Sequence, residues 1–122
     1  MYKRQVLDLL RSDVPVRGLA HITGGGVSNL LRLGPGRLGF AIDAPLPVPP
    51  VFALVARLGA VSDPEMGEVC NLGCGFVAIV PAGCADETAA LLAARHPGAA
   101  RIGSVTGEPG RVTVAGVTRS AD

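Results

Sequence analysis

The 122-residue chain has no tryptophan, one tyrosine and three phenylalanines. So few aromatic rings offer little surface on which the bases of single-stranded nucleic acid could stack. The eleven basic residues are scattered and are matched by ten acidic residues, which leaves a formal net charge of +1. Proteins that bind nucleic acid usually carry a basic patch or stripe. We therefore expect no nucleic acid as a partner.

Long apolar runs and a paired set of cysteines are also lacking. No apolar run reaches the length of a membrane helix, and no apolar segment follows the N-terminal charges as it would in a signal peptide. Three residues separate Cys70 from Cys74, unlike the two-residue gap of a zinc knuckle, and Cys84 stands alone. We expect no metal site, no membrane partner and a reduced, cytoplasmic protein whose cysteines are small buried apolar residues.

The apolar fraction of 48% predicts a folded chain, and the length suits a single domain. Helical spacing, prolines, glycines and apolar runs predict the local structure. Helices are expected at 2–11, 27–33, 51–58 and 85–95, and after an N-cap at Asp63; strands are expected at 16–22, 38–42, 75–80, 100–106 and 111–117, the last two around a turn at 107–110. Because helices and strands interleave without strict βαβ units, we predict an α+β (layered α/β) domain with a mixed sheet covered by helices.

The most informative stretch is GLAHITGGG at residues 18–26. Three consecutive glycines allow a backbone with positive φ and a close approach to a bound group. The helix expected at 27–33 would leave the N–H groups of its first turn without intrahelical partners, at the positive end of its dipole. The stretch therefore predicts a site for phosphate or another anion. A glycine triplet by itself is more often only a turn.

These residues resemble a known family. The stretch at 18–26 is similar to the AHITGGG segment of phosphoribosylformylglycinamidine cyclo-ligase, also called aminoimidazole ribonucleotide synthetase, of purine biosynthesis. A second stretch, Glu65-Met66 followed by CNLGCGF at 70–76, resembles the EM…FNMGxG motif of that family. Gly67, Glu68 and Cys70 replace the family's common residues in this loop. The matching segments run in the family's order over nearly the whole chain.

The resemblance implies that residues 1–122 form a single domain, equivalent to the C-terminal substrate-site domain of the cyclo-ligase. The glycine- and aspartate-rich motifs of the N-terminal ATP-binding domain are absent from this sequence. ATP and magnesium would be held mainly by that domain, and none is expected on this chain alone. The expected partners are a small-molecule ribonucleotide, an N-terminal ATP-binding domain or subunit, and further copies in a homo-oligomer. The sequence leaves open whether the chain is an excised piece of a longer enzyme, a natural fragment, or the product of one gene of a split pair.

The family closes an imidazole ring: ATP phosphorylates the formyl oxygen of formylglycinamidine ribonucleotide, and an internal nitrogen then attacks that carbon. The resemblance implies a catalytic role for His21, as a hydrogen-bond donor or proton shuttle. The implied substrate-phosphate-binding residues are Thr23, Gly24, Gly25 and Gly26, and the implied substrate-orienting residues are Asn29, Asn71, Gly73 and Gly75. Asn71 is equally well interpreted as a turn former that bonds its own backbone.

Two other functions compete with the cyclo-ligase. A related ATP-dependent enzyme of hydrogenase maturation, selenophosphate synthesis or thiamine-phosphate phosphorylation would share the architecture, but those families lack the AHITGGG segment. A stand-alone, non-catalytic binding or assembly module is compatible with the missing ATP motifs and the altered loop. Under the first interpretation, the isolated chain should be inactive or nearly so.

Overall fold

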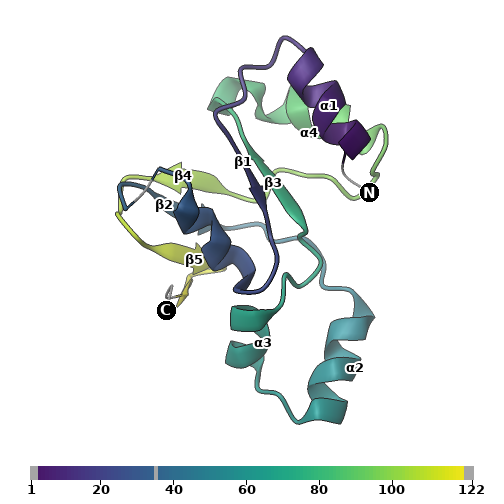
Figure 1. Ribbon diagram of the computed structural model, residues 1–122, viewed down its shortest axis with the longest axis vertical. Helices are drawn as coiled ribbons and strands as arrows, with labels where there is room; N and C mark the ends of the chain where they lie inside the picture. Colours follow the sequence, from purple (N-terminus) through teal and green to yellow (C-terminus); the bar gives the residue numbers. More distant parts are fainter. Residues whose placement is uncertain (1–2, 35, 120–122) are drawn as a thin grey trace.

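The computed structural model describes residues 3–34 and 36–119 (Figure 1). Helices and strands interleave along the chain, which confirms the predicted α+β class. The elements are α1 (Lys3–Arg11), β1 (Gly18–His21), the 3-10 helix η1 (Gly26–Arg32), β2 (Gly39–Ile42), α2 (Pro50–Gly59), α3 (Asp63–Val69), β3 (Phe76–Ile79), the 3-10 helix η2 (Ala82–Cys84), α4 (Ala85–Ala93), β4 (Ser104–Thr106), β5 (Val112–Val114) and β6 (Val117–Arg119).

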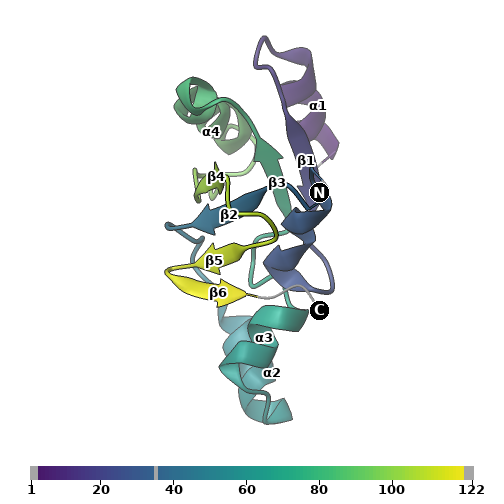
Figure 2. The same cartoon turned by 90° about the vertical axis from the view of Figure 1, so that its left-hand side faces the viewer.

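The strands form two separate sheets. β1 and β3 pair as an antiparallel two-stranded ladder. The other strands form a four-stranded sheet in the order β4-β2-β5-β6, which Figure 2 shows most clearly. In it β2 pairs parallel to β5, whereas β4 and β6 are antiparallel to their neighbours. The larger sheet is therefore mixed, as predicted, and the ladder stands outside it.

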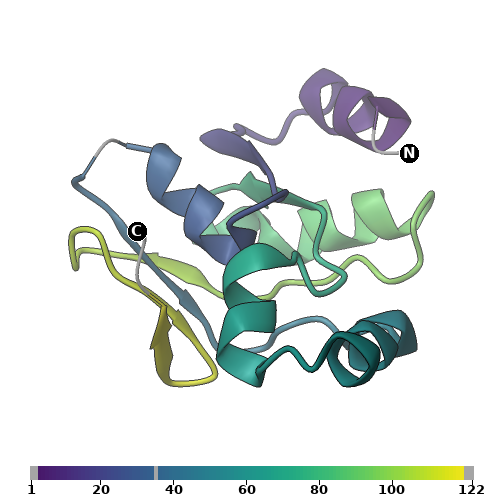
Figure 3. The same ribbon diagram turned by 60° about the horizontal axis from the view of Figure 1, so that its bottom comes forward.

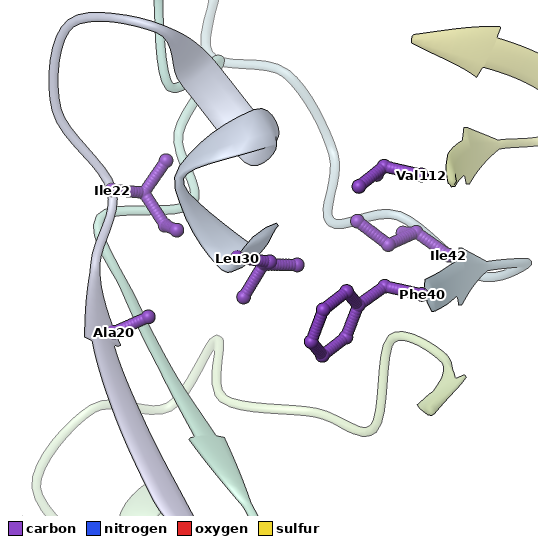
Figure 4. Packing of buried hydrophobic residues seen from close by; sticks show 6 residues of the cluster. All are labelled: Ala20, Ile22, Leu30, Phe40, Ile42 and Val112. Carbon is purple, nitrogen blue, oxygen red and sulfur yellow. The ribbon is translucent and has the colours of Figure 1, made fainter. Parts of the chain in front are cut away.

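The main hydrophobic core lies where the ladder, η1 and the four-stranded sheet meet (Figure 4). Burying a large apolar side chain stabilises a fold by about 1.5–3 kcal/mol, so this cluster is what holds the two sheets and η1 together. Its buried members are Ala20, Ile22, Leu30, Phe40, Ile42 and Val112. On the other side of the ladder, α1 packs against α4, and an Asp8–Arg95 ion pair links this helix to the residues that follow α4.

The structure corrects several predicted helix boundaries. The helix expected at 27–33 is the 3-10 helix η1. Asp63 is the first residue of α3 and not its N-cap, because the Ser62 hydroxyl accepts the hydrogen bond from the Glu65 amide at 3.4 Å. The helix expected to reach Arg95 ends at Ala93, so Arg95 is free to turn toward Asp8 on α1.

The C-terminal strands also differ from the sequence prediction. The strand expected at 100–106 is restricted to β4, and the strand expected at 111–117 is divided into β5 and β6. Ala115 and Gly116 both have positive φ, of 50° and 84°, which turns the chain back on itself. β4 and β5 do not pair with each other across the turn at 107–110, because β2 lies between them.

Candidate functional site

The tertiary structure brings the two sequence motifs together at the end of the ladder nearest α3 (Figure 1). The Ile22 amide donates to the Gly75 carbonyl at 2.9 Å. His21 lies opposite Phe76 in the register of the ladder, with ring centroids 6.3 Å apart. The glycine stretch and the second motif therefore form one local structure, although they are far apart in the sequence.

The glycine loop is shaped by two left-handed residues and by a close approach to α3. Gly25 and Gly26 have φ of 99° and 58°. A Cβ placed on Gly26 would lie 2.5 Å from the Gly67 carbonyl oxygen and 2.9 Å from that of Cys70. Gly26 is buried, and its amide donates to the Thr23 carbonyl at 3.1 Å. Only glycine satisfies both the backbone conformation and the space at this position.

The donors available to an anion differ from those expected. The Gly26 amide is used within the loop, so it cannot donate to a phosphate. The α-helix whose dipole was expected to help is a seven-residue 3-10 helix. The Gly24 and Gly25 amides have no hydrogen-bond acceptor among the described residues, and a Cβ on Gly24 would meet nothing within 4 Å. The candidate anion site is therefore a pair of loop amides without protein acceptors, on the exposed Gly24 and the half-buried Gly25, beside Thr23.

Asn29 lies beneath this loop and not on its open side. Only 5% of the residue is exposed, and its Nδ2 donates to the Thr23 hydroxyl at 3.5 Å. Its Oδ1 lies 3.1 Å from where a Cβ on Gly25 would stand. The structure therefore does not support the predicted role in orienting a substrate: Asn29 supports the loop from below.

Asn71 acts as a turn former in the second motif. Its Oδ1 accepts from the Gly73 amide at 2.9 Å, and its Nδ2 donates to the Ile22 carbonyl at 3.5 Å. Gly73 has φ of 95°, and a Cβ there would lie 2.5 Å from Cδ of Pro49. The side chain thus ties the second motif to the glycine stretch, which matches the alternative interpretation of Asn71. Gly73 permits the close approach of Pro49. Gly75 contributes the carbonyl that accepts the hydrogen bond from the Ile22 amide.

The exposed rim of the site is formed by His21, Thr23 and Gly24. An imidazole, a hydroxyl and open backbone amides can together receive an anion and exchange a proton beside it. Among residues 3–34 and 36–119, no cluster of three or more histidines, cysteines or acidic residues could hold a metal ion. The described residues therefore offer no group of side chains that would fit a magnesium site. Nor does any helix in these residues have the length and apolar character to span a bilayer.

Sequence reasoning missed a cavity of about 900 Å³ beside this site. Side chains of α1, the ladder, β2, α4 and the segment 99–105 line it, as do Asn71, Gly73 and Gly75. Within the described part of the chain, Thr88 Oγ1 and Gln5 Oε1 are buried without a hydrogen-bond partner, and both residues line the cavity. A single threonine in the alanine-rich helix expected at 85–95 gives no distinctive sequence signal of such a cavity.

The sequence comparisons define the family. The model of the family described as "AIR synthase related protein, C-terminal domain" matches residues 1–115, and the chain belongs to that family. A phosphoribosylformylglycinamidine cyclo-ligase of Thermococcus kodakarensis is 44% identical over 110 residues, which are 90% of this chain and 31% of the relative. The cyclo-ligases of Methanothermobacter thermautotrophicus and Methanopyrus kandleri are 42% and 40% identical. The chain thus spans about a third of the length of these relatives.

A solved structure confirms the fold. Escherichia coli HypE, a hydrogenase maturation protein, superposes with a TM-score of 0.67 at 25% sequence identity. The match covers 99% of this chain and 38% of the HypE chain. The architecture is therefore one that other members of the wider AIR-synthase-like group share.

Proposed function

We propose that this chain is the C-terminal domain of a phosphoribosylformylglycinamidine cyclo-ligase and contributes one wall of the site that closes the imidazole ring of aminoimidazole ribonucleotide. The observation that carries the proposal is the 40–44% identity to proteins of that name over 87–93% of this chain. The hydrogen-bonded junction between the glycine stretch and the second motif supports it, because the family resemblance rests on the same two segments.

The open amides of Gly24 and Gly25, with the Thr23 hydroxyl, would receive a phosphate group of the ribonucleotide. Backbone N–H donors suit this task because they bring partial positive charge close to the anion without side-chain bulk. His21, on the same rim, would donate a hydrogen bond to the reacting amide or carry its proton. Asn29 and Asn71 would hold the two loops in position.

ATP would supply the phosphoryl group that activates the formyl oxygen, and we assign ATP and magnesium to an N-terminal ATP-binding domain or subunit. The chain by itself would then bind substrate weakly and turn nothing over. We further propose a cytoplasmic location and a homo-oligomeric assembly.

A domain of a hydrogenase maturation protein is the second candidate, and the structural likeness to HypE favours it. The identity to HypE is 25%, against 44% to the cyclo-ligase of T. kodakarensis. The cyclo-ligase assignment is therefore the stronger of the two.

The test uses the complete two-domain enzyme that carries this domain. Gly24→Val places a branched side chain in open space, so the fold should tolerate it while the loop amides become obstructed. We expect isothermal titration with formylglycinamidine ribonucleotide to show at least about tenfold weaker binding, equivalent to about 1.4 kcal/mol. Gly107→Val, at another open glycine far from the rim in sequence, is the matched control. Unchanged affinity in the Gly24 variant would refute the phosphate-binding role of the loop.

His21→Ala separates binding from chemistry in the same enzyme. If His21 handles a proton, kcat should fall by more than about tenfold while substrate affinity changes little. A near-normal kcat would reduce His21 to a residue that packs against Phe76.

A further inference from the structure

The two sheets of the domain leave a gap between strand β3 and strand β4. Among the described residues, β3 pairs with β1 alone and β4 pairs with β2 alone, so each strand has one unpaired edge. The cavity of about 900 Å³ lies in this gap, since its lining includes the continuous runs 73–80 and 99–105. Figure 2 shows β3 on the side of the ladder that is nearer β4. The cavity is therefore bordered by two strands that each lack a neighbour.

The unpaired edge of β3 carries backbone groups that the ladder does not use. The Gly75 carbonyl accepts from the Ile22 amide at 2.9 Å, which places it on the side of β1. The Ile79 carbonyl accepts from the Arg17 amide at 2.7 Å, on the same side. Because successive residues of a strand point their backbone groups to opposite edges, Ala78 directs its amide and its carbonyl away from β1. No described residue forms a hydrogen bond with either group.

The edge of β4 that faces away from β2 is unpaired in the same way. The Phe40 amide of β2 donates to the Arg111 carbonyl at 2.8 Å, so the backbone of Phe40 faces β5. Val105 lies opposite Phe40 in the β2–β4 register and therefore receives no ladder hydrogen bond from it. Val105 is 39% exposed and lines the cavity. Its backbone and that of Ala78 thus offer unused donors and acceptors from the two strands that border the cavity.

The lining of the cavity indicates what kind of group would fill it. Helices α1 and α4, which pack against each other (Figure 3), contribute apolar side chains such as Leu9 and Leu92. Leu30 and Phe40 contribute apolar side chains from the main core, on the other side of the ladder. A strand that is buried on both faces carries a nearly continuous run of apolar residues. A compact apolar molecule would leave both strand edges without hydrogen bonds, whereas an extended apolar segment would pair with them.

Helix α1 indicates where such a segment would come from. Gln5 and Val6 of α1 line the cavity, so the described structure begins beside the gap. A strand that lies antiparallel to β3 runs parallel to β1, and parallel strands need a crossover connection that is usually a helix. α1 precedes β1 and can serve as that crossover, in a split βαβ arrangement. The chain spans about a third of the length of its cyclo-ligase relatives, so the rest of such a protein can supply the strand.

We infer that this gap is the docking site of an extended, mostly apolar segment of the N-terminal ATP-binding domain or subunit. The segment pairs with β3 on one side and with β4 on the other, and it joins the two sheets into one. Main-chain hydrogen bonds to Ala78 and Val105 hold it, and the apolar walls select its side chains. The inference rests on the proposed function for the identity of the partner, and it states how that partner is held.

The first test compares amide hydrogen exchange, at single-residue resolution, in this chain alone and in the complete two-domain enzyme. We expect the amides of Ala78 and Val105 to exchange at least about 100-fold more slowly in the complete enzyme, because each gains an acceptor. The Val77 amide is the internal control. The alternation along β3 directs it toward β1 in both proteins, so its exchange should change much less.

The second test uses Ala78→Pro, which removes the outward amide of β3. Proline is tolerated on the open side of an edge strand but not inside a sheet. We expect the variant to lower the midpoint of thermal unfolding at least about 5 °C more in the complete enzyme than in this chain alone. Val77→Pro is the matched control, because it removes an amide on the ladder side and should destabilise both proteins.

Unchanged exchange at Ala78 and Val105 in the complete enzyme would overturn the inference. Equal slowing at Ala78 and Val77 would show a surface packed over the cavity without strand pairing, and would overturn it too. Strong protection already present in this chain alone would assign the gap to residues of this chain or of a second copy. None of these measurements involves substrate, so their failure is distinct from an unchanged substrate affinity in Gly24→Val, which refutes the phosphate-binding role.

Discussion

The amide of Ile22 and the carbonyl of Gly75 are joined by a hydrogen bond of 2.9 Å at the point where the glycine stretch leaves the ladder. This bond continues the pairing of β1 with β3 by one residue beyond His21 and Phe76. It fixes the position, at the end of the β1–β3 ladder, from which the glycine loop begins. The conformation of the candidate site is therefore determined by contacts between the two motifs, and the following predictions test those contacts.

Gly26→Ala should destabilise the domain by at least about 2 kcal/mol. A non-glycine residue in the left-handed region costs about 1–2 kcal/mol, and here the new Cβ would also collide with the Gly67 carbonyl. Urea unfolding monitored by circular dichroism measures the change. Gly24→Ala is the control, since open space surrounds that position, and it should stay within about 0.5 kcal/mol of the wild type. Equal stability of both variants would contradict the described packing against α3.

Asn71→Ala should lower the free energy of unfolding by about 1–2 kcal/mol, because the Gly73 amide and the Ile22 carbonyl both lose a partner. Asn71→Asp retains the acceptor for the Gly73 amide and should lose less. Denaturation curves of the two variants distinguish the contributions of the two bonds. A loss of substrate binding in the two-domain enzyme with no loss of stability would instead assign Asn71 to the substrate.

Thr88→Val should raise the free energy of unfolding by about 1 kcal/mol. The buried Thr88 hydroxyl has no partner among the described residues, and valine has nearly the same shape without the polar group. Thr88→Ser, which retains a hydroxyl and removes the methyl group, should be less stable than the wild type. A lower unfolding midpoint for Thr88→Val would show that the hydroxyl bonds a partner in solution.

The stability of the domain should fall in alkaline solution partly because of Cys74. Burial raises the pKa of the Cys74 thiol. The unfolded chain ionises this thiol near its ordinary pKa of about 8.5, so above that pH the unfolded state loses a proton that the folded state retains. Its contribution to stability is thus complete below that pH and is lost as the pH rises toward the folded-state pKa. Cys74→Ala should make the decline in unfolding free energy above about pH 8.5 less steep.

Cys84→Ala is the matched control for this measurement, because it removes a thiol that is only half-buried. Identical slopes in the wild type and Cys74→Ala would show that the Cys74 thiol ionises equally in both states.

Much of the local structure could be predicted from the sequence. Spacing and helix-ending residues correctly predicted α1 and α2, and β2 was placed to within a residue. The site was predicted less well. Gly26 and Asn29 belong to the expected stretch, but both contribute to the loop from its inner side. Whether an amide faces solvent or a neighbouring carbonyl depends on what packs there, and α3 comes from a distant part of the chain.

Local patterns alone determined the class of fold and the family, and they located several of the turns, because apolar spacing and glycine placement act within a few residues along the chain. Only the tertiary structure decided which amides of the glycine loop are open, that Asn29 lies underneath it, and that α2 turns an apolar face outward. These properties follow from contacts between segments far apart in sequence, such as Gly26 with Gly67 and Gly73 with Pro49. The side-chain pattern of one segment does not specify which distant segment of the chain will pack against it.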